Sequence, residues 1–311
     1  MSKESAEKEE RIAPADRKVP LFSLGRAWII ARGTVTQLIR MKTLYFLLAF
    51  ALIIVAFGNF SLGGTAAKEL STIKRACFGA MDSFAWMFAI ISTALLIPRD
   101  QEDRTLYTIL SKPVRRMEYL VGKLIGVLVV IGVFLALMFV VTSMILIARQ
   151  SSFIGDELSA MDQNSRMSQE QRIAQIEFIQ RQGFRFELGI SAIASFLKAA
   201  VIASVTILLS TFASSSLFTI VISLLVFLIG HFHSLANSFY KYHSGDNIIV
   251  QMLLKLVKIL IPDFQLYAFS EGIVMGGAVI YPLVWQMGLI TVGYLVVFLM
   301  LSALIFVDKE F

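Results

Sequence analysis

Six long apolar stretches constrain the fold of this chain more than any other feature of its sequence. Each supplies about 20 largely apolar residues, the length that a helix needs to cross the hydrocarbon core of a bilayer. Of the 311 residues, 57% are hydrophobic and 16% are charged, which is far more apolar than a soluble domain. We therefore predict an all-α integral membrane protein whose transmembrane domain, residues 44–311, contains six transmembrane helices. They are expected at about residues 44–60, 78–97, 119–148, 188–212, 217–235 and 280–307.

The segment before the first apolar stretch divides into two parts. Residues 1–20 are polar and charge-rich and contain no apolar core, so they predict a disordered cytosolic tail and not a signal peptide. Residues 21–43 are basic and amphipathic and contain a tryptophan directly before a spanning stretch, which is typical of a helix at the membrane interface. We predict an interfacial elbow helix here, with an ordinary cytosolic helix as the alternative. Its apolar face is expected to contain Leu24, Ala27, Trp28, Ala31, Val35 and Leu38.

The distribution of Lys and Arg predicts the orientation of the chain. An even number of spans places both termini on one side, and the segments on that side are denser in Lys and Arg than those on the other. Because cytoplasmic loops are enriched in these residues, we predict cytoplasmic N- and C-termini. This asymmetry also explains the net charge of +6, and no basic patch interleaved with aromatic residues indicates nucleic-acid binding.

A polar island interrupts the apolar pattern at residues 98–123, which read PRDQEDRTLYTILSKPVRRMEYLVGK. Thr105 is a good helix cap, and the apolar residues after it have the spacing of one helical face, which predicts about two turns of amphipathic helix. Pro113 is well placed to open the next helix. A solvated loop is the alternative. The helical face would contain Leu106, Ile109 and Leu110, with Tyr107 beside them, while Arg115, Arg116 and Lys123 are expected at headgroup depth, where anionic membrane lipid favours them.

The order of residues in this island resembles the coupling-helix region of type-2 ATP-binding cassette (ABC) transporter permeases. An acidic residue, Glu102, is followed by a Thr-Leu pair that begins at Thr105, by a Leu-Ser-Lys-Pro-Val-Arg segment around Pro113, and by a Gly-Lys pair that opens the third span. Arg104 stands where many members of the family have Gly. The most similar branch includes permeases for copper-enzyme maturation and for gliding motility. The resemblance identifies residues 98–118 as a cytoplasmic coupling region.

The resemblance also implies a function for the chain as the membrane subunit of a transporter. Two such subunits, identical or related, would face each other across a pathway, and each would dock its short helix on a separate cytosolic ATPase that binds ATP and Mg. ATP hydrolysis would then drive export, or mechanical work on the membrane, in a bacterial inner membrane. The ATPase-coupling residues implied in this way are Glu102, Arg104, Thr105, Leu106, Tyr107, Ile109, Leu110, Pro113 and Arg116.

Sequence motifs for catalysis are missing from the chain. There is no G-x-x-x-x-G-K-[ST] phosphate loop, so we do not expect this chain to bind ATP or another cofactor, and there is no H-E-x-x-H or G-x-S-x-G motif. We therefore predict a transporter subunit and not an enzyme. Two alternatives remain: a membrane scaffold that anchors an ATPase without transport, and a membrane enzyme that uses the outer segments.

Two charged residues, Asp82 and Lys198, fall inside predicted spans. Charges in such places usually face a bundle interior or water, so we expect the two to line a polar pathway or to pair with each other, with snorkelling to the outer interface as the alternative. The three histidines, His231, His233 and His243, are expected to be packing or interfacial side chains. No metal site is predicted, and a shared metal on these histidines is the alternative.

Two segments between spans are predicted to lie on the outer side. Residues 149–187 contain a short amphipathic pattern, which predicts a helix that caps the outer mouth or binds a periplasmic partner. Residues 236–279 are apolar but are interrupted by lysines, a proline and glycines. We predict re-entrant or interfacial half-helices for this second segment.

Overall fold

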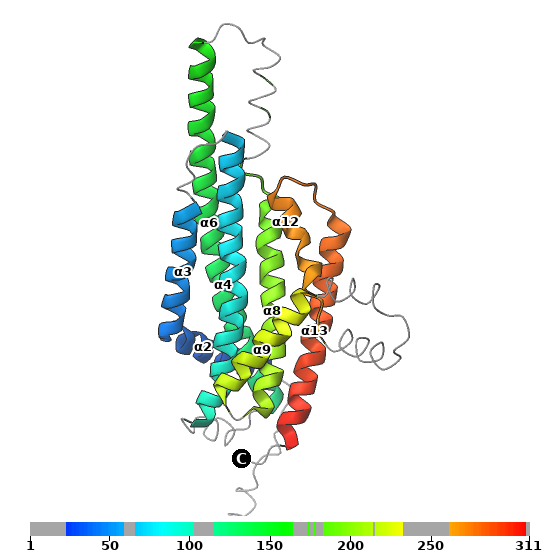
Figure 1. Cartoon of the computed structure of the whole chain (residues 1–311). Coiled ribbons are helices and arrows are strands. Elements are labelled where there is room, and N and C mark those ends of the chain that lie inside the picture. The colour runs from blue at the N-terminus through cyan, green and yellow to red at the C-terminus, as the bar shows by residue number, and fades with distance from the viewer. Residues whose placement is uncertain are drawn as a thin grey trace, which may run out of the picture.

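The computed structural model shows an elongated bundle of helices (Figure 1). It describes residues 23–58, 66–102, 115–163, 173, 177, 183–213, 215–232 and 261–308. Within these residues there are eight α-helices and one short 3-10 helix. They are α2 (Leu24–Ile39), α3 (Lys42–Gly58), α4 (Ala66–Glu102), α6 (Arg116–Gln163), α8 (Leu188–Phe212), α9 (Ser216–His231), η1 (Phe264–Tyr267), α12 (Phe269–Val274) and α13 (Tyr281–Asp308).

Four of these helices contain a segment long and apolar enough to cross a membrane, so the chain is a multi-pass membrane protein. The bent pair α2 and α3 adds a fifth crossing if it counts as one span. The sequence predicts six crossings. The first and fifth of these correspond to α3, which has 17 residues, and to α9, which has 16, and these two helices are too short to count as crossings by themselves. The four segments are Lys68–Asp100, Arg116–Gly155, Leu188–Phe212 and Tyr281–Ile305.

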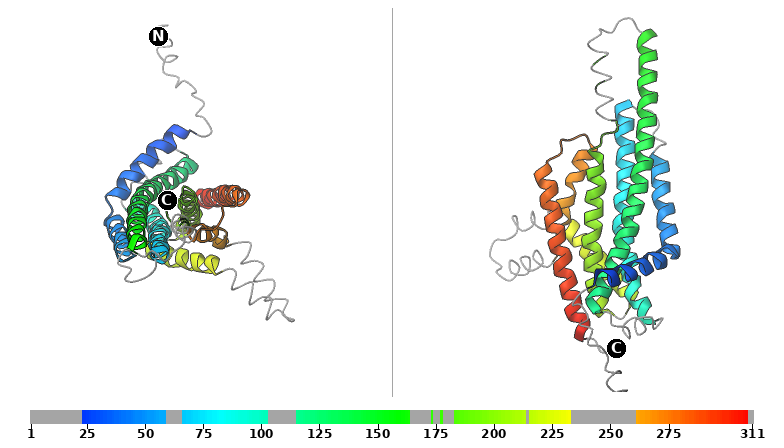
Figure 2. Two further views of the ribbon diagram at one scale, coloured as in Figure 1. Left: turned by 90° about the horizontal axis from the view of Figure 1, so that it is seen from above. Right: turned by 180° about the vertical axis from the view of Figure 1, so that it is seen from behind.

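Helix α8 lies at the centre of the bundle and packs against α4, α6 and α13 (Figure 2). Its buried residues include many small ones, among them Ala194, Ala199 and Ala203. Small residues let neighbouring helices approach closely, which is how helices associate in lipid. Helices α4 and α6 meet through aromatic rings, and the rings of Phe84 and Phe134 stack with centroids 3.4 Å apart.

Helices α6 and α13 differ from the central helix in their surroundings. Helix α6 has 48 residues, or about 72 Å at 1.5 Å per residue, and extends beyond the other helices at the top of Figure 1. Helix α13 lies at the side of the bundle and exposes large apolar residues, including Trp285, Val292 and Leu304. Such a surface is expected where a helix faces lipid.

Helix α2 lies across the base of the bundle, and α3 rises beside α4 after a bend of 65° (Figures 1 and 2). Some residues of the apolar face predicted for α2 are buried, and others are exposed. Ala27, Ala31 and Leu38 are buried against the bundle, whereas Leu24 and Trp28 are 73% and 61% exposed. Leu24 and Trp28 lie one turn apart on the same face of α2. The helix therefore has one apolar face that packs against the bundle and a second apolar face that is exposed.

Helix α9 crosses part of the bundle, and η1 and α12 continue the path. In Figure 1, α9 rises from the base to about mid-height, and η1 with α12 runs from there to the top. The two pieces meet where the side-chain amide of Gln265 donates to the carbonyl oxygen of His231 at 3.2 Å. They also meet at Gly230, where a Cβ would lie 2.6 Å from the Phe264 ring, so this contact requires glycine. Of residues 236–279, for which the sequence predicts half-helices, the structure describes only 261–279.

Candidate functional site

The predicted coupling helix lies in a gap between two described helices. Helix α4 ends at Glu102, whose side chain is not described, and α6 begins at Arg116, which is partly buried. Between them, Arg104, Thr105, Leu106, Tyr107, Ile109, Leu110 and Pro113 lie outside the described residues. Their helical conformation therefore stays a prediction, and what the structure does describe is how both ends of the gap are held.

The carboxylate of Glu118 holds the end of the gap at α6. Its two oxygens accept hydrogen bonds from the backbone N–H of Ser23 at 2.7 Å and of Arg115 at 3.1 Å. The guanidinium of Arg26 also lies 3.4 Å from it, and Glu118 is fully buried. Arg115 precedes α6 and Glu118 is the third residue of that helix, so the carboxylate caps the helix and carries a charge that the helix dipole favours. The start of α2 is thus tied to the start of α6.

Two glycines of α6, Gly122 and Gly126, allow α2 to lie directly on that helix. They are four residues apart and therefore share one face. A Cβ at Gly122 would lie 2.7 Å from the carbonyl oxygen of Ala27, and a Cβ at Gly126 would lie 2.6 Å from Cβ of Thr34. No side chain fits at either position unless α2 moves away.

Asp100 holds the other end of the gap, in the last turn of α4. Its carboxylate lies 2.6 Å from Nζ of Lys123 and accepts a hydrogen bond of 2.6 Å from the hydroxyl of Tyr119, both on α6. The amide of Gln37 on α2 donates to the second oxygen at 3.3 Å, and Nζ of Lys123 donates to the carbonyl oxygen of that amide at 3.1 Å. All four side chains form one network, in which Asp100, Tyr119 and Lys123 are buried.

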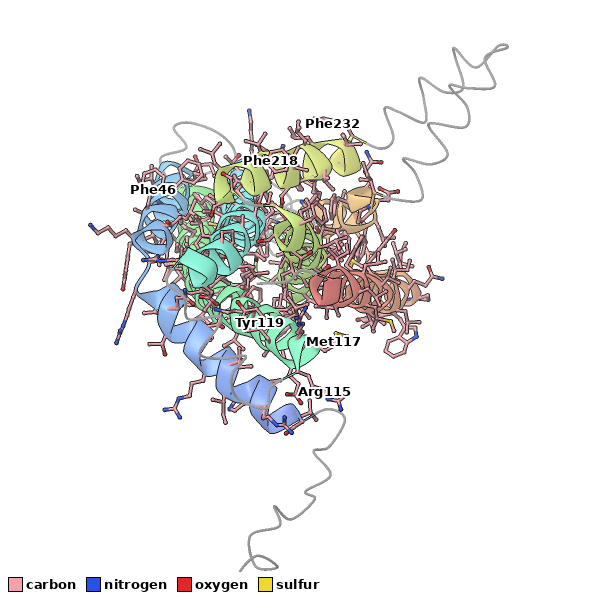
Figure 3. The ribbon with its side chains drawn as sticks, turned by 90° about the horizontal axis from the view of Figure 1, so that it is seen from below. Phe46, Arg115, Met117, Tyr119, Phe218 and Phe232 are labelled. Carbon is pink, nitrogen blue, oxygen red and sulfur yellow. The ribbon has the colours of Figure 1, made fainter. Side chains whose placement is uncertain are left out.

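Together these contacts form what we call the elbow clamp, which joins α2, α4 and α6 around both ends of the coupling segment. Seen from below, α2 runs along the base beside the start of α6, where Arg115, Met117 and Tyr119 lie (Figure 3). A force on residues 103–114 would therefore reach three helices at once. The residues of the clamp are Ser23, Arg26, Gln37, Asp100, Glu118, Tyr119, Gly122, Lys123 and Gly126.

The clamp corrects one expectation and adds residues that the sequence did not single out. Lys123 was expected beside anionic lipid headgroups, but it is 5% exposed and faces Asp100 instead. Glu118 carries a local signal, because a glutamate three residues after a helix start is typical of a cap. Gln37 and Asp100 carry none, because their partners are distant in the sequence.

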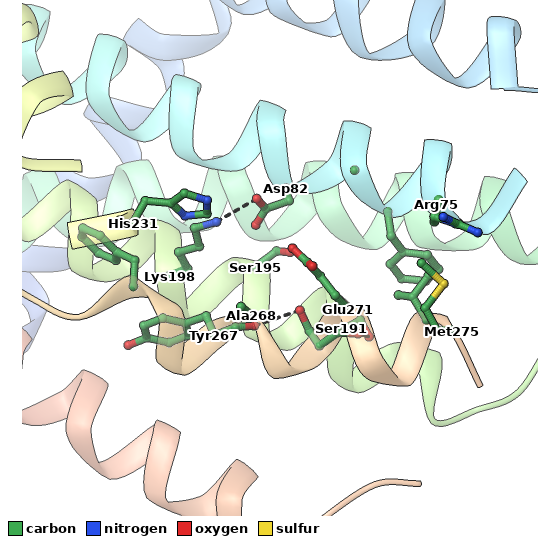
Figure 4. A pocket seen from close by; sticks show the side chains of 15 residues that line it. Arg75, Asp82, Ser191, Ser195, Lys198, His231, Tyr267, Ala268, Glu271 and Met275 are labelled. Carbon is green, nitrogen blue, oxygen red and sulfur yellow. Dashed lines mark hydrogen bonds and ion pairs between the residues drawn. The ribbon is translucent and has the colours of Figure 1, made fainter. Parts of the chain in front are cut away.

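Asp82 and Lys198, the two charges predicted inside spans, form an ion pair. Nζ of Lys198 on α8 lies 2.8 Å from Oδ2 of Asp82 on α4. The ammonium group also lies 5.5 Å from the centre of the Phe227 ring, in cation–π geometry. Lys198 is buried while the Asp82 side chain is 34% exposed, so the pair lies where protein interior meets a cavity (Figure 4). Mutual pairing, one of the predicted alternatives, is therefore present.

Of the three histidines, the structure describes one. His231 ends α9, and its ring packs beside that of Phe227, with centroids 5.7 Å apart. His233 and His243 lie outside the described residues. Among the described residues, no group of three or more His, Cys, Asp or Glu side chains could hold a metal ion.

The fold and these sites define a multi-pass membrane protein with charged groups buried among its helices, at the base and in the upper half. Such groups inside membrane helices are typical of transporters and channels. The family pattern described as ABC-2 family transporter protein matches residues 60–311. The chain therefore belongs to the ABC-2 transporter family and is the membrane component of an ABC transporter, which generally pairs with an ATPase subunit. No curated protein matches the chain.

Proposed function

We propose that this chain is a permease subunit that couples ATP hydrolysis by a separate cytosolic ATPase to export, or to mechanical work on the membrane. In this proposal the ATPase contacts the chain through residues 103–114. The observation that carries the proposal is the elbow clamp, because both ends of that segment are fastened to the same elbow helix. A scaffold that only anchors an ATPase has no need for such a rigid connection to the spans.

The physical basis of coupling is the strength and position of these contacts. Hydrogen bonds to charged groups contribute about 1.5–3 kcal/mol each, and the carboxylates of Glu118 and Asp100 each accept more than one. Helices α4 and α6 both pass through the whole bundle (Figure 1). A displacement of the coupling segment would therefore tilt these helices before it broke the clamp.

The finer features of the proposal follow from the sequence and the family. Thr105 opens a helix whose Leu106, Ile109 and Leu110 face enters a cleft of the ATPase, with Tyr107 beside it. Pro113 lies before α6, while Glu102, Arg104 and Arg116 flank the contact. ATP and Mg bind to the ATPase and not to this chain.

The proposed arrangement in the membrane has six crossings. Helix α3 makes the first, α9 lies in the fifth at about residues 217–235, and re-entrant or interfacial half-helices lie within residues 236–279, with α2 on the inner leaflet as the elbow. Both termini then lie in the cytoplasm of a bacterium, and residues 149–187 face a periplasmic partner or cap the outer mouth. A second permease copy or a related subunit completes the pathway, and Asp82 with Lys198 contributes polar lining. The branch that includes copper-enzyme maturation and gliding motility is the proposed place of the chain in its family.

The experiment that tests this function is affinity purification of the full chain from its native host, followed by mass spectrometry. We expect recovery of an ATPase that contains a phosphate loop, and loss of that ATPase from Leu106→Asp, because the new charge lies on the docking face. Thr108→Asp is the matched control, since it adds the same charge to the same segment off the predicted face. Equal recovery of an ATPase by both variants, or recovery of none by the wild type, would refute the proposal.

A further inference from the structure

A cavity of about 270 Å³ lies between α4, α8, the end of α9, and η1 with α12 (Figure 4). Its buried end contains Lys198, which is 7% exposed. Its outer end contains Arg75 of α4 and Glu271 of α12, which are both exposed. Helix α12 closes one side, where the hydroxyl of Ser191 donates to the carbonyl oxygen of Ser270 at 3.1 Å. The cavity is therefore enclosed by helices on several sides and is open at one end.

The two long helices that line the cavity contribute residues with the same spacing. Helices α4 and α8 run in the same direction, both from the top of the bundle downward (Figure 1). Along α4, the lining residues Arg75, Gly79 and Asp82 have the spacing i, i+4, i+7. Along α8, the lining residues Ser191, Ser195 and Lys198 have the same spacing.

The ion pair joins these two rows at the buried end of the cavity. Asp82 contacts Lys198 there, and Arg75 and Ser191 each lie seven residues earlier on their own helices. Seven residues correspond to about 10 Å along a helix. The cavity thus extends about 10 Å from its ion pair to its outer cation.

Gly79 provides the space in the middle of the cavity. A Cβ at this position would meet nothing within 4 Å, so glycine is not required here for helix packing. A larger side chain at residue 79 would instead project into the cavity, because Gly79 is one of its lining residues. This position allows the cavity to be filled while the ion pair stays intact.

The charged groups of the lining balance each other. The lining contains two cationic side chains, Arg75 and Lys198, and two carboxylates, Asp82 and Glu271. An ammonium group has three N–H donors, and the structure gives Lys198 one hydrogen bond, to Asp82. Beside them, Nδ1 of His231 is buried and has no hydrogen-bond partner among the described residues. The buried end therefore has unused donors and acceptors, which is costly unless a polar group occupies the site.

We propose that this cavity binds a small zwitterion, with its ammonium group at Asp82 and its anionic group toward Arg75. A net anion would face two carboxylates, a net cation would face two cationic side chains, and an apolar ligand would leave the buried polar groups without partners. The meaning of the site for transport rests on the proposed function, but binding itself does not need the ATPase. A free zwitterion and a zwitterionic lipid headgroup share this chemistry.

Binding to the purified full chain without ATPase tests the proposal and separates the two sources. Isothermal titration with sn-glycero-3-phosphoethanolamine in phosphatidylglycerol nanodiscs probes a free zwitterion, with ethanolamine and dimethyl phosphate as singly charged comparisons. Native mass spectrometry of the chain from mixed phosphatidylethanolamine and phosphatidylglycerol nanodiscs probes the lipid. Gly79→Leu fills the cavity, and Gly288→Leu in α13 is the matched control, because a Cβ at Gly288 also meets nothing within 4 Å and does not line the cavity.

We expect one of the two zwitterionic probes to bind and to be preferred at least about tenfold over its singly charged comparison, which corresponds to the loss of one charged hydrogen bond. Gly79→Leu should abolish this binding and Gly288→Leu should preserve it, while Asp82→Asn should weaken it without filling the cavity. Which probe binds identifies the source. The proposal is overturned if neither zwitterion binds, if binding survives in Gly79→Leu, or if a singly charged probe binds equally well. Each of these outcomes is independent of whether an ATPase is recovered.

Discussion

At the scale of single residues, Glu118 accepts hydrogen bonds from two backbone N–H groups in the elbow clamp. Replacing it with Ala leaves the N–H groups of Ser23 and Arg115 without an acceptor. We predict that Glu118→Ala lowers the free energy of unfolding by about 2–3 kcal/mol, and that Glu118→Gln, which keeps one acceptor oxygen, lowers it less. Thermal unfolding in detergent with a thiol-reactive dye measures the effect, because Cys77 is buried and is the one cysteine of the sequence. Equal melting temperatures for wild type and Glu118→Ala would mean that the clamp does not stabilise the fold.

The pair of Asp82 and Lys198 makes a second prediction at this scale, because each residue depends on the other. Asp82→Asn leaves a buried ammonium without a counter-charge and should cost up to about 3–5 kcal/mol. Lys198→Met should cost less, because the Asp82 carboxylate is 34% exposed and water can reach it. The double variant should recover part of the loss, since it leaves no unpaired charge. The same unfolding assay measures all three variants, and additive losses would contradict an interaction between the two residues.

At the scale of elements, the crossing of α2 and α6 depends on glycine at two positions. A Cβ at Gly122 or Gly126 would lie within 3 Å of atoms of α2, so Gly122→Ala and Gly126→Ala should force the two helices apart. We predict a loss of about 1–3 kcal/mol for each, the usual effect of overpacking. Gly79→Ala is the matched control in a spanning helix, where open space and the helix propensity of alanine predict no loss. If all three variants melted at the same temperature, α2 would not pack on α6 as closely as the structure shows.

The helices themselves could be predicted from the sequence, but several of their limits could not. Apolar length is enough to locate α4, α6, α8 and α13, because lipid requires a continuous run of apolar side chains. The bend between α2 and α3 falls at Arg40 and Met41, where neither proline nor glycine marks it. Near the end of α9, Gly230 lies against Phe264, which is a contact between distant segments. Local patterns contain no information about such contacts.

For the candidate sites too, features marked by local sequence patterns could be predicted, whereas contacts between distant segments could not. The positions of Asp82 and Lys198 inside apolar stretches were enough to mark them as functional candidates, because charges are costly in lipid. Their pairing was one of three alternatives, since helix register cannot be read from one chain. Lys123 was misplaced for a related reason, because its partner Asp100 lies on another helix. The coupling residues from Arg104 to Pro113 remain predictions from the sequence and its family resemblance.

At the scale of the whole molecule, the bundle has buried charges at two heights that serve different proposed roles. The elbow clamp lies at the base, where α2 joins the ends of α4 and α6 (Figure 2). The ion pair of Asp82 and Lys198 lies higher, and α4 contains residues of both groups. Because Asp82 and Asp100 are 18 residues apart on one helix, or about 27 Å, a tilt of α4 at its base would also move the wall of the cavity. This connection is how the ATPase would act on the upper part of the bundle.

The measurement that tests the central claim most directly is ATP turnover by the partner ATPase reconstituted with this chain in nanodiscs. We predict that the wild-type chain stimulates turnover, that Leu106→Asp reduces turnover to the level of the ATPase alone, and that Thr108→Asp retains the stimulation. Size-exclusion chromatography of each variant checks that the chain is folded. If Leu106→Asp supports the same turnover as the wild type, residues 103–114 do not couple this chain to its ATPase, and the proposed function is wrong.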